Sequence, residues 1–563
     1  MIYLDIMRYL KHITIFLISC AIVAPLGLSA QVHKRVEVTT IYTPEIATAT
    51  KLDVPATIAE NNEMEPDIVY NVYPDTWQIK LQDHNFKPAT ASYWDYSRSE
   101  HFYTRLASGY PLVSDGAFRF MTQNVRMGYF GIGIDHDGNF SQRRNDAGVV
   151  RSIADSYDMR NRVSVNGGVV TGKQTFEAAL TYDCDFYNRY AVLNNPSRDL
   201  FHDADATLRY GDSFADLSRL NFCVEARGGF WNHMPLSEGN AFASVSEFNA
   251  GGAVRLKRDF HDNVIGLDLE YDMWQSTSTA YRDMRFGGSV QYARDFDIVK
   301  VDAAVGYLYD RVRNHDKASH FVLPRLRLDF DFGLDALQPY VDVNTTVSQN
   351  STAQLFEINP FIDYLHASEA LLEMPNTRSY NLSIGVAGVA FSSKLAYRAY
   401  LGANFMHNQV LWYINEVGTF GVATTDNNRL FFGAEVEYRP VGGLSIGAKF
   451  AAHGDNSKGE YVVSDARMRG SVDVEYNIKR WKFYAKGELL GKRRWSAIAE
   501  EGINYEAFVA PTIFDLGVGI SFRASNRVEI FIDGCNLLNQ SIYDYAYYYR
   551  NGIGGMAGVK IEF

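Results

Sequence analysis

The chain has 563 residues and a formal net charge of −12, from 54 basic and 66 acidic side chains. A nucleic-acid-binding protein usually presents a basic face, so this balance argues against a nucleic-acid partner. Aromatic residues make up 14% of the chain, with 36 Tyr and 35 Phe, whereas Pro occurs only 15 times. This composition favours a strand-rich protein, because aromatic residues suit strands and proline does not.

The first 30 residues have the features of an export signal. Arg8 and Lys11 precede an apolar stretch over 13–28, and Ala30 supplies a small residue before the expected cleavage point. This order is typical of a secretory signal peptide, which we predict over residues 1–30. Beyond it no run of about 20 apolar residues occurs, so no transmembrane helix is expected.

Residues 31–100 form a different kind of segment. They hold five of the 15 prolines and the polar run ENNEMEPD. Such a composition predicts extended or irregular structure, in the periplasm or in the lumen of the barrel proposed below.

From residue 101 onward, short segments alternate strictly between apolar and polar residues. Examples are RLRLDFDF at 325–332, RMRGSVDVEYNIK at 467–479 and FDLGVGISFR at 514–523. Alternation with period two indicates strands with one apolar and one polar face. A soluble sandwich alternates too, but here the polar faces are heavily charged. The segments are also about ten residues long, the length that a tilted strand needs to cross a bilayer.

The number of these segments indicates a large closed barrel. About 22 can be placed, an even number of the kind found in bacterial outer-membrane barrels. The sequence therefore predicts an all-β, transmembrane, antiparallel β-barrel over residues 101–563, in the outer membrane of a Gram-negative bacterium and surrounded by its lipid. The segments begin near residues 101, 117, 126, 161, 175, 203, 219, 247, 263, 284, 299, 321, 337, 380, 396, 429, 443, 467, 481, 514, 527 and 554.

The connections between the segments predict the orientation. Those that follow even-numbered segments are short, such as TGKQ and RASN, whereas those that follow odd-numbered segments are mostly longer. The long ones are expected at 137–160, 349–378, 408–428 and 492–511. Outer-membrane barrels have short periplasmic turns and long outer loops, so both ends of the barrel domain should be periplasmic.

The last 36 residues, VEIFIDGCNLLNQSIYDYAYYYRNGIGGMAGVKIEF, resemble the C-terminus of TonB-dependent receptors. The shared features are the corner Asn536–Asn539, a tyrosine-rich loop, Gly552 and a final strand that ends on Phe563. Leu538 stands where that family usually has phenylalanine. The resemblance implies that the final strand closes the barrel against the first. It also implies that Phe563 belongs to the signal read by the outer-membrane assembly machinery.

One departure from that family concerns the element that fills the barrel. TonB-dependent receptors carry an N-terminal plug domain, and residues 31–100 are too few for the usual plug. The lumen is therefore expected to be filled by this segment, by inward-folded outer loops or by a separate plugging protein. The stretch Val36, Glu37, Val38, Thr39 and Thr40 is a candidate TonB box, which would pair with TonB by strand addition. The alternative is an ordinary extended stretch at the inner rim.

Aromatic residues in two predicted outer loops are candidate contacts for a ligand or a partner. They are Phe356, Phe361 and Tyr364 in the first loop, and Trp412 and Tyr413 in the second. Exposed aromatic side chains often anchor ligands. Alternatively, these rings pack the loops together or belong to the interfacial aromatic belt.

The function that these features favour is ligand uptake across the outer membrane by a receptor-like barrel with a reduced plug or none. The alternative is a barrel that serves as a subunit or scaffold of an outer-membrane complex and does not transport by itself. A passive porin is less favoured. No catalytic constellation, cofactor site or metal site is predicted. The half-match DHDGN to a calcium loop lacks the closing glutamate at the required spacing.

Overall fold

A computed structural model of the chain describes residues 101–124, 128–145, 152–192, 198–236, 244–276, 282–312, 318–363, 371, 374–458, 460–499 and 502–563. The expected signal peptide, the segment 31–100 and the candidate TonB box lie outside these residues. Among the described residues, no helix is long and apolar enough to cross a membrane.

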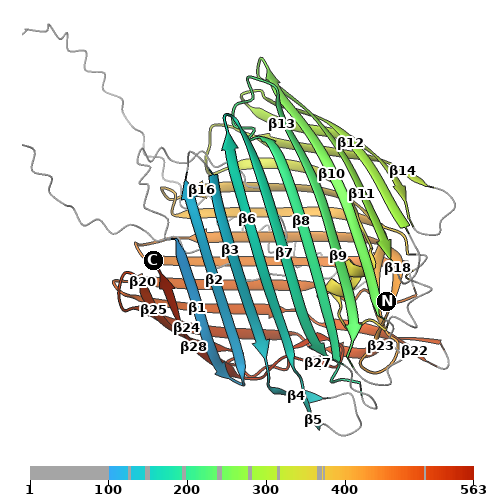
Figure 1. Cartoon of the computed structure of the whole chain (residues 1–563), viewed down its shortest axis with the longest axis vertical. Helices are drawn as coiled ribbons and strands as arrows, with labels where there is room; N and C mark the ends of the chain where they lie inside the picture. Colours follow the sequence, from blue (N-terminus) through green and yellow to red (C-terminus); the bar gives the residue numbers. More distant parts are fainter. Residues whose placement is uncertain are drawn as a thin grey trace, which may run out of the picture. The chain divides into compact units, whose positions relative to one another are not determined.

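The described residues form one closed barrel of long, tilted strands, each antiparallel to its neighbours (Figure 1). The sheet has 24 strands, of which 22 make the ring and two, β22 (Arg493–Ala499) and β23 (Gly502–Ala510), form a hairpin joined to it by a single bridge. The ring strands are β1 (Phe102–Tyr110), β2 (Val113–Asn124), β3 (Gly128–Asn139), β6 (Asp158–Thr171), β7 (Gln174–Asn188), β8 (Arg198–Asp212), β9 (Asn221–Pro235), β10 (Val245–Phe260), β11 (Asn263–Ser276), β12 (Arg282–Asp295), β13 (Val299–Arg311), β14 (Ser319–Phe330), β15 (Gln338–Ser348), β16 (Thr377–Ala390), β17 (Leu395–Ile414), β18 (Phe420–Tyr438), β19 (Leu444–Ser457), β20 (Met468–Ile478), β21 (Trp481–Leu490), β24 (Ile513–Arg523), β25 (Val528–Cys535) and β28 (Gly554–Glu562).

Each of the 22 segments predicted from alternation corresponds to one ring strand, so the predicted barrel is confirmed. β1 begins and β28 ends at the same end of the barrel, the one predicted to be periplasmic. We call this the inner end and the opposite one the outer end. The hairpins β4–β5 (Gln142–Asn145 and Ser152–Asp155) and β22–β23 lie at the outer end (Figure 1).

The predicted outer loop over 408–428 is wrong. β17 continues to Ile414 and β18 begins at Phe420, which leaves only five residues between them. The pairing continues past a register shift between Met406 and Gln409, so the hairpin rises beyond the height at which the apolar alternation ends. The alternation is lost in this extension, because residues 410–414 are apolar in succession and residues 424–428 are polar in succession, so it looked like a loop.

The two faces of the wall differ in the way that lipid requires. On β18, Leu430, Phe432 and Val436 point outward and are 69, 51 and 40% exposed. The residues between them face the lumen, where Arg429 pairs with Asp455 at 2.7 Å. Apolar side chains therefore cover the outside of the barrel, and charged pairs line its inside.

Some luminal side chains lie flat against the wall, which explains several strand glycines. Tyr400 on β17 stands directly opposite Gly433 on β18. A Cβ atom at Gly433 would collide with the Tyr400 ring. Glycine here lets the ring fold across the neighbouring strand and leaves the lumen wider.

The ring is closed by the first and last strands. β1 and β28 pair over eight positions, from Tyr103 opposite Glu562 to Tyr110 opposite Gly555. Beyond them, Phe102 and Phe563 exchange both backbone hydrogen bonds, at 2.8 and 3.0 Å. Their rings stack with centroids 5.1 Å apart and an interplanar angle of 3°. The terminal phenylalanine thus pairs with the first strand by backbone and side chain together.

Replacing Phe563 with alanine should weaken this closure. Loss of the ring stack is expected to cost about 0.5–1.5 kcal/mol beyond lost burial. We expect a lower urea midpoint for the purified, micelle-refolded barrel, measured by heat-modifiable migration on gels. Phe391→Ala is the matched control, because Phe391 is also an exposed inner-end phenylalanine but lies far from the closing strands. Equal midpoints for the two variants would contradict a role of Phe563 in closure.

Candidate functional site: a lid across the outer mouth

The outer connections of the barrel fold inward and pack on one another. Eleven buried residues form one apolar cluster, nine of them from four connections and two, Ile414 and Phe420, from the strand ends on either side of a fifth connection. We call the described parts of the connections that meet there the lid: residues 189–192, 349–363, 371, 374–376, 415–419, 491–499, 502–512 and 536–553. The described cluster members are Tyr190, Ala191, Phe361, Ile414, Phe420, Trp495, Ala510, Tyr543, Ala546, Tyr548 and Tyr549.

The longest lid connection begins with a short helix, α2 (Thr352–Ile358), which packs against the luminal face of the barrel wall near the outer end. The Ser351 hydroxyl caps the helix by accepting from the Gln354 amide at 3.3 Å. The Glu247 carboxylate on β10 accepts from the Thr352 amide at 2.9 Å. A carboxylate at a helix N-terminus satisfies free amides and favours the helix dipole. These contacts place α2 against β10.

Phe356 anchors the helix to the wall through a second apolar cluster. Its side chain is 2% exposed and contacts Phe201, Trp231 and His233, with centroids 5.8, 5.5 and 5.0 Å away. These three residues lie at the outer ends of β8 and β9 and face the lumen. Aromatic pairs at such distances stabilise a contact beyond their buried area.

A buried charged group joins the same connection to a different loop. Arg189 Nε pairs with Asp199, and Arg189 Nη2 donates to the carbonyls of Pro360 and Ile362 at 3.1 and 3.0 Å. Asp199 also contacts His233 Nε2 at 3.0 Å. All three charged or titratable side chains are fully buried. A buried pair of this kind is costly to break, because either partner alone would be an uncompensated charge.

The centre of the lid is a stack of aromatic rings. Phe361 lies flat on Tyr548, with centroids 3.5 Å apart and an interplanar angle of 12°. Tyr545 meets Phe361 edge-on at 5.4 Å and donates its hydroxyl to the Ile358 carbonyl. The tyrosine-rich loop between β25 and β28 therefore covers the loop between β15 and β16. Residues 543–549, which include strands β26 (Tyr543–Tyr545) and β27 (Tyr548–Tyr549), form a tongue inside the lid.

Contacts at Gly418 cross the mouth of the barrel. Gly418 lies in the β17–β18 connection, and its carbonyl accepts a hydrogen bond from the Tyr548 hydroxyl at 2.6 Å. Its Cα lies so near Ala191 that an added Cβ would be 2.7 Å from the Ala191 carbonyl carbon. Ala191 belongs to the β7–β8 connection, ten strands away in a ring of 22. Connections from opposite sides of the barrel thus touch.

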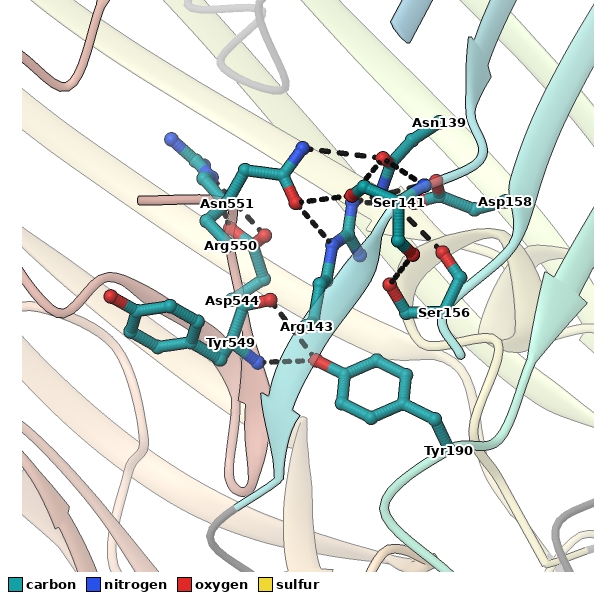
Figure 2. Close-up of polar contacts among 10 residues, drawn as sticks. All are labelled: Asn139, Ser141, Arg143, Ser156, Asp158, Tyr190, Asp544, Tyr549, Arg550 and Asn551. Atoms are coloured by element: carbon teal, nitrogen blue, oxygen red, sulfur yellow. Dashed lines mark hydrogen bonds and ion pairs between the residues drawn. The ribbon is translucent and has the colours of Figure 1, made fainter. Parts of the chain in front are cut away.

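Tyr190 links the same loop to the tongue. Its hydroxyl donates to the Tyr549 carbonyl at 3.0 Å and lies 2.6 Å from the Tyr549 amide (Figure 2). Burial raises the pKa of Tyr190 and that of Tyr548 well above the ordinary tyrosine value. Both hydroxyls therefore stay protonated and keep donating at any pH near neutrality.

A polar cluster holds the base of the tongue to the first outer hairpin. The Asn551 side chain bonds to Asn139, Ser141 and Arg143 at 3.2, 3.0 and 3.1 Å (Figure 2). Arg143 on β4 also pairs with Asp158 at 3.1 Å. This cluster connects the last hairpin of the ring to the loop between β3 and β6.

Arg493 on β22 fixes the tongue from the other side. Its guanidinium donates to the Asp544 carbonyl at 3.0 Å and to the Tyr543 carbonyl. Burial lowers the pKa of Arg493 to about 10, which still leaves it charged at neutral pH. The tongue is thus hydrogen-bonded to four other connections of the lid.

The structure places the aromatic candidates within or beside the lid. Phe356 and Phe361 are buried in its two apolar clusters, and Tyr364 lies outside the described residues. Trp412 and Tyr413 lie on β17 and not in a loop. Trp412 packs against both clusters, and Tyr413 stacks on Tyr461 at 4.5 Å. A ligand would reach Phe356 or Phe361 only after the lid had moved.

Sequence reasoning missed most of the lid residues. Arg189, Asp199 and His233 are separated in the chain and occur in no recognisable pattern. The tyrosines of the tongue were noticed only as part of the C-terminal resemblance. Their number is the one signal in the sequence, since five tyrosines within seven residues are unusual for an exposed loop.

The fold and the lid define a class of protein: a large outer-membrane barrel whose outer connections fold inward and meet across the mouth. Solved structures with the same barrel are transporters and receptors. The chain superposes on the FrpB iron transporter from Neisseria meningitidis with a TM-score of 0.67 and 10% identity, over 83% of this chain and 82% of that one. It matches the copper transporter OprC with a TM-score of 0.63, 12% identity and the same coverage.

A third similar structure is the siderophore receptor PiuA from Acinetobacter baumannii, with a TM-score of 0.58, 9% identity, and coverage of 83% of this chain and 82% of that one. No protein-family model and no curated protein sequence matches the chain. At these identities the likeness concerns the fold, and it supports the resemblance of the last strands to receptors of the TonB-dependent type.

Gly418→Ala should loosen the lid. The residue has φ of 86°, where a side chain is strained, and the added methyl group would collide with Ala191. We expect faster cleavage of the lid by a nonspecific protease, with the barrel itself intact on gels. Gly333→Ala is the control, because Gly333 has φ of 71° in an inner turn but no atom within 4 Å of the added group. If both variants resist the protease like the unmodified chain, Gly418 does not hold the lid.

Proposed function

We propose that this chain is a gated uptake barrel of the outer membrane, in which the lid closes the outer mouth until a ligand displaces it. One observation carries the proposal: connections from opposite sides of the ring meet in a single buried aromatic cluster. A 22-strand barrel encloses a lumen wide enough to need a plug. Loops that merely decorated the rim would not bury eleven residues together.

The chemistry of the lid suits a gate. Besides their ring contacts, tongue residues 543–549 bond to the other connections through tyrosine hydroxyls, carbonyls and one arginine. Each such hydrogen bond contributes about 0.5–1.5 kcal/mol net, because water competes for the same groups. A ligand that offers alternative partners for these groups can therefore displace the tongue. Phe356 and Phe361 are proposed to contact the ligand in the opened state, together with Tyr364, Trp412 and Tyr413.

The similar structures support uptake as the purpose of the gate. They are named as transporters of iron and copper and as a receptor of a siderophore, and they share this barrel. We propose that energy for transport enters through Val36–Thr40, paired with TonB as an added strand. Residues 31–100 are proposed to lie at the inner end or within the lumen.

The gate is tested by conductance in planar bilayers. Four proteins are compared: the mature chain, the chain without residues 31–100, the Phe361→Ala/Tyr548→Ala variant, and the combination of the last two changes. We expect the chain without residues 31–100 to remain nearly silent, because the lid still closes the mouth. The combined variant should conduct steadily. In the control protein, Leu112→Ala takes the place of Phe361→Ala/Tyr548→Ala. Leu112 lies in an outer turn away from the lid cluster.

A steady large pore in the chain that lacks only residues 31–100 would overturn the gate. The barrel would then need a separate plugging partner, and the subunit or scaffold function would take precedence. Silence of the combined variant would also count against the gate, since the lid change should open it.

Coupling to TonB is tested by binding. The purified barrel is immobilised and exposed to the periplasmic domain of the host's TonB. Deletion of Val36–Thr40 should abolish binding, because the strand that pairs with TonB is lost. Deletion of residues 46–50 is the control of equal length and should bind normally. Equal binding by both deletions would show that Val36–Thr40 is an ordinary extended stretch.

A further inference from the structure

One seam of the ring is paired over only part of its length. β14 and β15 pair over four positions, residues 326–329 opposite residues 340–343, all near the inner end. On their other sides, β14 pairs with β13 over 12 positions and β15 pairs with β16 over 11. Residues 319–325 of β14 and 344–348 of β15 therefore continue toward the outer end with no ladder between them. We call this part of the wall the split seam.

The split seam lies at the depth of the bilayer. Arg325 stands five residues before Phe330, the inner end of β14, and Ser319 stands 11 residues before it. At about 3.3 Å per residue and a tilt of about 40°, these positions are about 13 and 28 Å above the inner end, and the apolar band of such a barrel is about 25 Å tall. Val322 points outward in this stretch and is 60% exposed, as a lipid-facing residue is. The split seam therefore occupies the outer half of the band.

Pro324 lies within the split seam. Proline has no amide hydrogen to donate to a neighbouring strand, so in sheets it occurs at edges and bulges and not in central strands. The outer half of β14 behaves as such an edge, because only β13 accompanies it in register.

The outer ends of β15 and β16 bond to strands beyond β14. Gln349, the residue after β15, donates to the Asp283 carboxylate on β12 at 2.8 Å. Asn376, the residue before β16, donates to the Asp310 carboxylate on β13 at 2.8 Å. Both carboxylates point into the lumen and are 1 and 3% exposed. The outer ends of β15 and β16 therefore lean inward, past the luminal side of β14.

A side-chain contact across the split seam shows the same overlap. Arg378 belongs to the outward face of β16, four residues before Leu382, which is 46% exposed. Phe321 belongs to the inward face of β14, opposite the buried Leu308. The Arg378 guanidinium nevertheless lies 4.6 Å from the centroid of the Phe321 ring. The outward face of β16 thus meets the inward face of β14, and side chains close the wall here in place of a ladder.

The overlap buries polar atoms beside apolar side chains. Thr345 on β15 is only 9% exposed. Among the described residues, Thr345 Oγ1 and Arg378 Nε are buried and have no hydrogen-bond partner. A guanidinium with a spare donor suits a carboxylate, which it can bind with two parallel bonds. The apolar side chains of Phe321 and Leu308 suit a hydrocarbon chain.

We infer that the split seam opens sideways and passes a single-chain anionic amphiphile, such as a fatty acid, between the outer leaflet and the lumen. Arg378 and Thr345 bind its carboxylate, and Phe321 and Leu308 contact its chain. Opening breaks no ladder bond, and the four paired positions below the split seam act as the hinge. The apolar chain avoids the water above the membrane on this route. The inference concerns the wall and is independent of the gate at the mouth.

The route is tested with palmitic acid that carries a photoreactive diazirine near the end of its chain. The mature chain is placed in phosphatidylcholine nanodiscs with this probe and illuminated, and peptide mass spectrometry locates the labelled residues. We expect labels on Leu308 and Phe321, which face the lumen, as well as on the lipid-facing wall. Labels on the lipid-facing wall alone would overturn the inference.

A reversible staple shows whether the probe enters through the split seam. Asp310→Cys/Asn376→Cys, with the native cysteines of the mature chain replaced by serine, is joined by a short bifunctional thiosulfonate that holds β16 to β13. We expect luminal labelling to disappear, and to return when a reductant releases the staple before illumination. Val290→Cys/Val305→Cys is the control, because it staples two strands that are paired over 12 positions. Luminal labelling that persists with the Asp310–Asn376 staple in place contradicts a lateral route.

A further comparison separates the wall from the mouth. The staple is repeated together with Phe361→Ala/Tyr548→Ala, which loosens the lid. Luminal labelling should still be absent, because the probe comes from the bilayer. Its recovery would mean that the probe enters by the mouth, which overturns the lateral route and leaves the gate intact. Heat-modifiable migration checks that every variant is folded.

The charge of the head group is tested separately. Arg378→Gln should lower luminal labelling by the palmitic acid probe about tenfold, because a charge-assisted bond is lost. Labelling by the corresponding fatty alcohol should not change. Arg162→Gln is the control, since Arg162 lies on another part of the luminal wall, paired with Asp183 at 2.6 Å. Equal losses with the acid and the alcohol would overturn the assignment of an anionic head group.

Discussion

The bilayer core offers no hydrogen-bond partners, and the rest of this structure depends on that constraint. Every backbone amide and carbonyl at membrane depth must be paired within the protein, so a sheet in lipid has to close on itself. Here the closure is made by β1 and β28, the first and last ring strands in the chain. Once the ring is closed, alternation along each strand sends apolar side chains to lipid and charged ones to the lumen.

The same constraint removes the ordinary hydrophobic core. A barrel of this width has a charged interior wall, so its strands cannot bury apolar surface against each other inside. The described residues instead form two buried apolar clusters, and both lie at the outer mouth, where the connections fold inward. The lid is therefore the part of the molecule that packs like a soluble protein. It is stabilised mainly by aromatic contacts and the buried Arg189–Asp199 pair, and its own strands form only short hairpins.

The ring and the lid differ in how easily they open. The ring is held by many backbone hydrogen bonds that no solvent can replace in lipid, whereas the lid lies at the mouth, where polar groups released by opening can bond to water. The lid can therefore open at a cost that leaves the ring intact. The boundary between the two parts lies at the outer ends of the strands. There, Glu247, Asp199 and Arg143 belong to the wall or its first hairpin and bond to the lid.

The amino-acid sequence by itself determined the ring: period-two alternation is a local property, and each of its 22 segments could be read without knowing its partners. It also indicated which end of the barrel is periplasmic, because the lengths of the connections can be counted along the sequence. The lid was decided only by the tertiary structure. Tyr190, Gly418 and Tyr548 come from connections far apart in sequence, and they meet because the closed ring brings opposite hairpins to one mouth. The extended β17–β18 hairpin was missed for a related reason: above the bilayer both faces of a strand meet water or other loops, so the alternation that reveals a strand in lipid disappears.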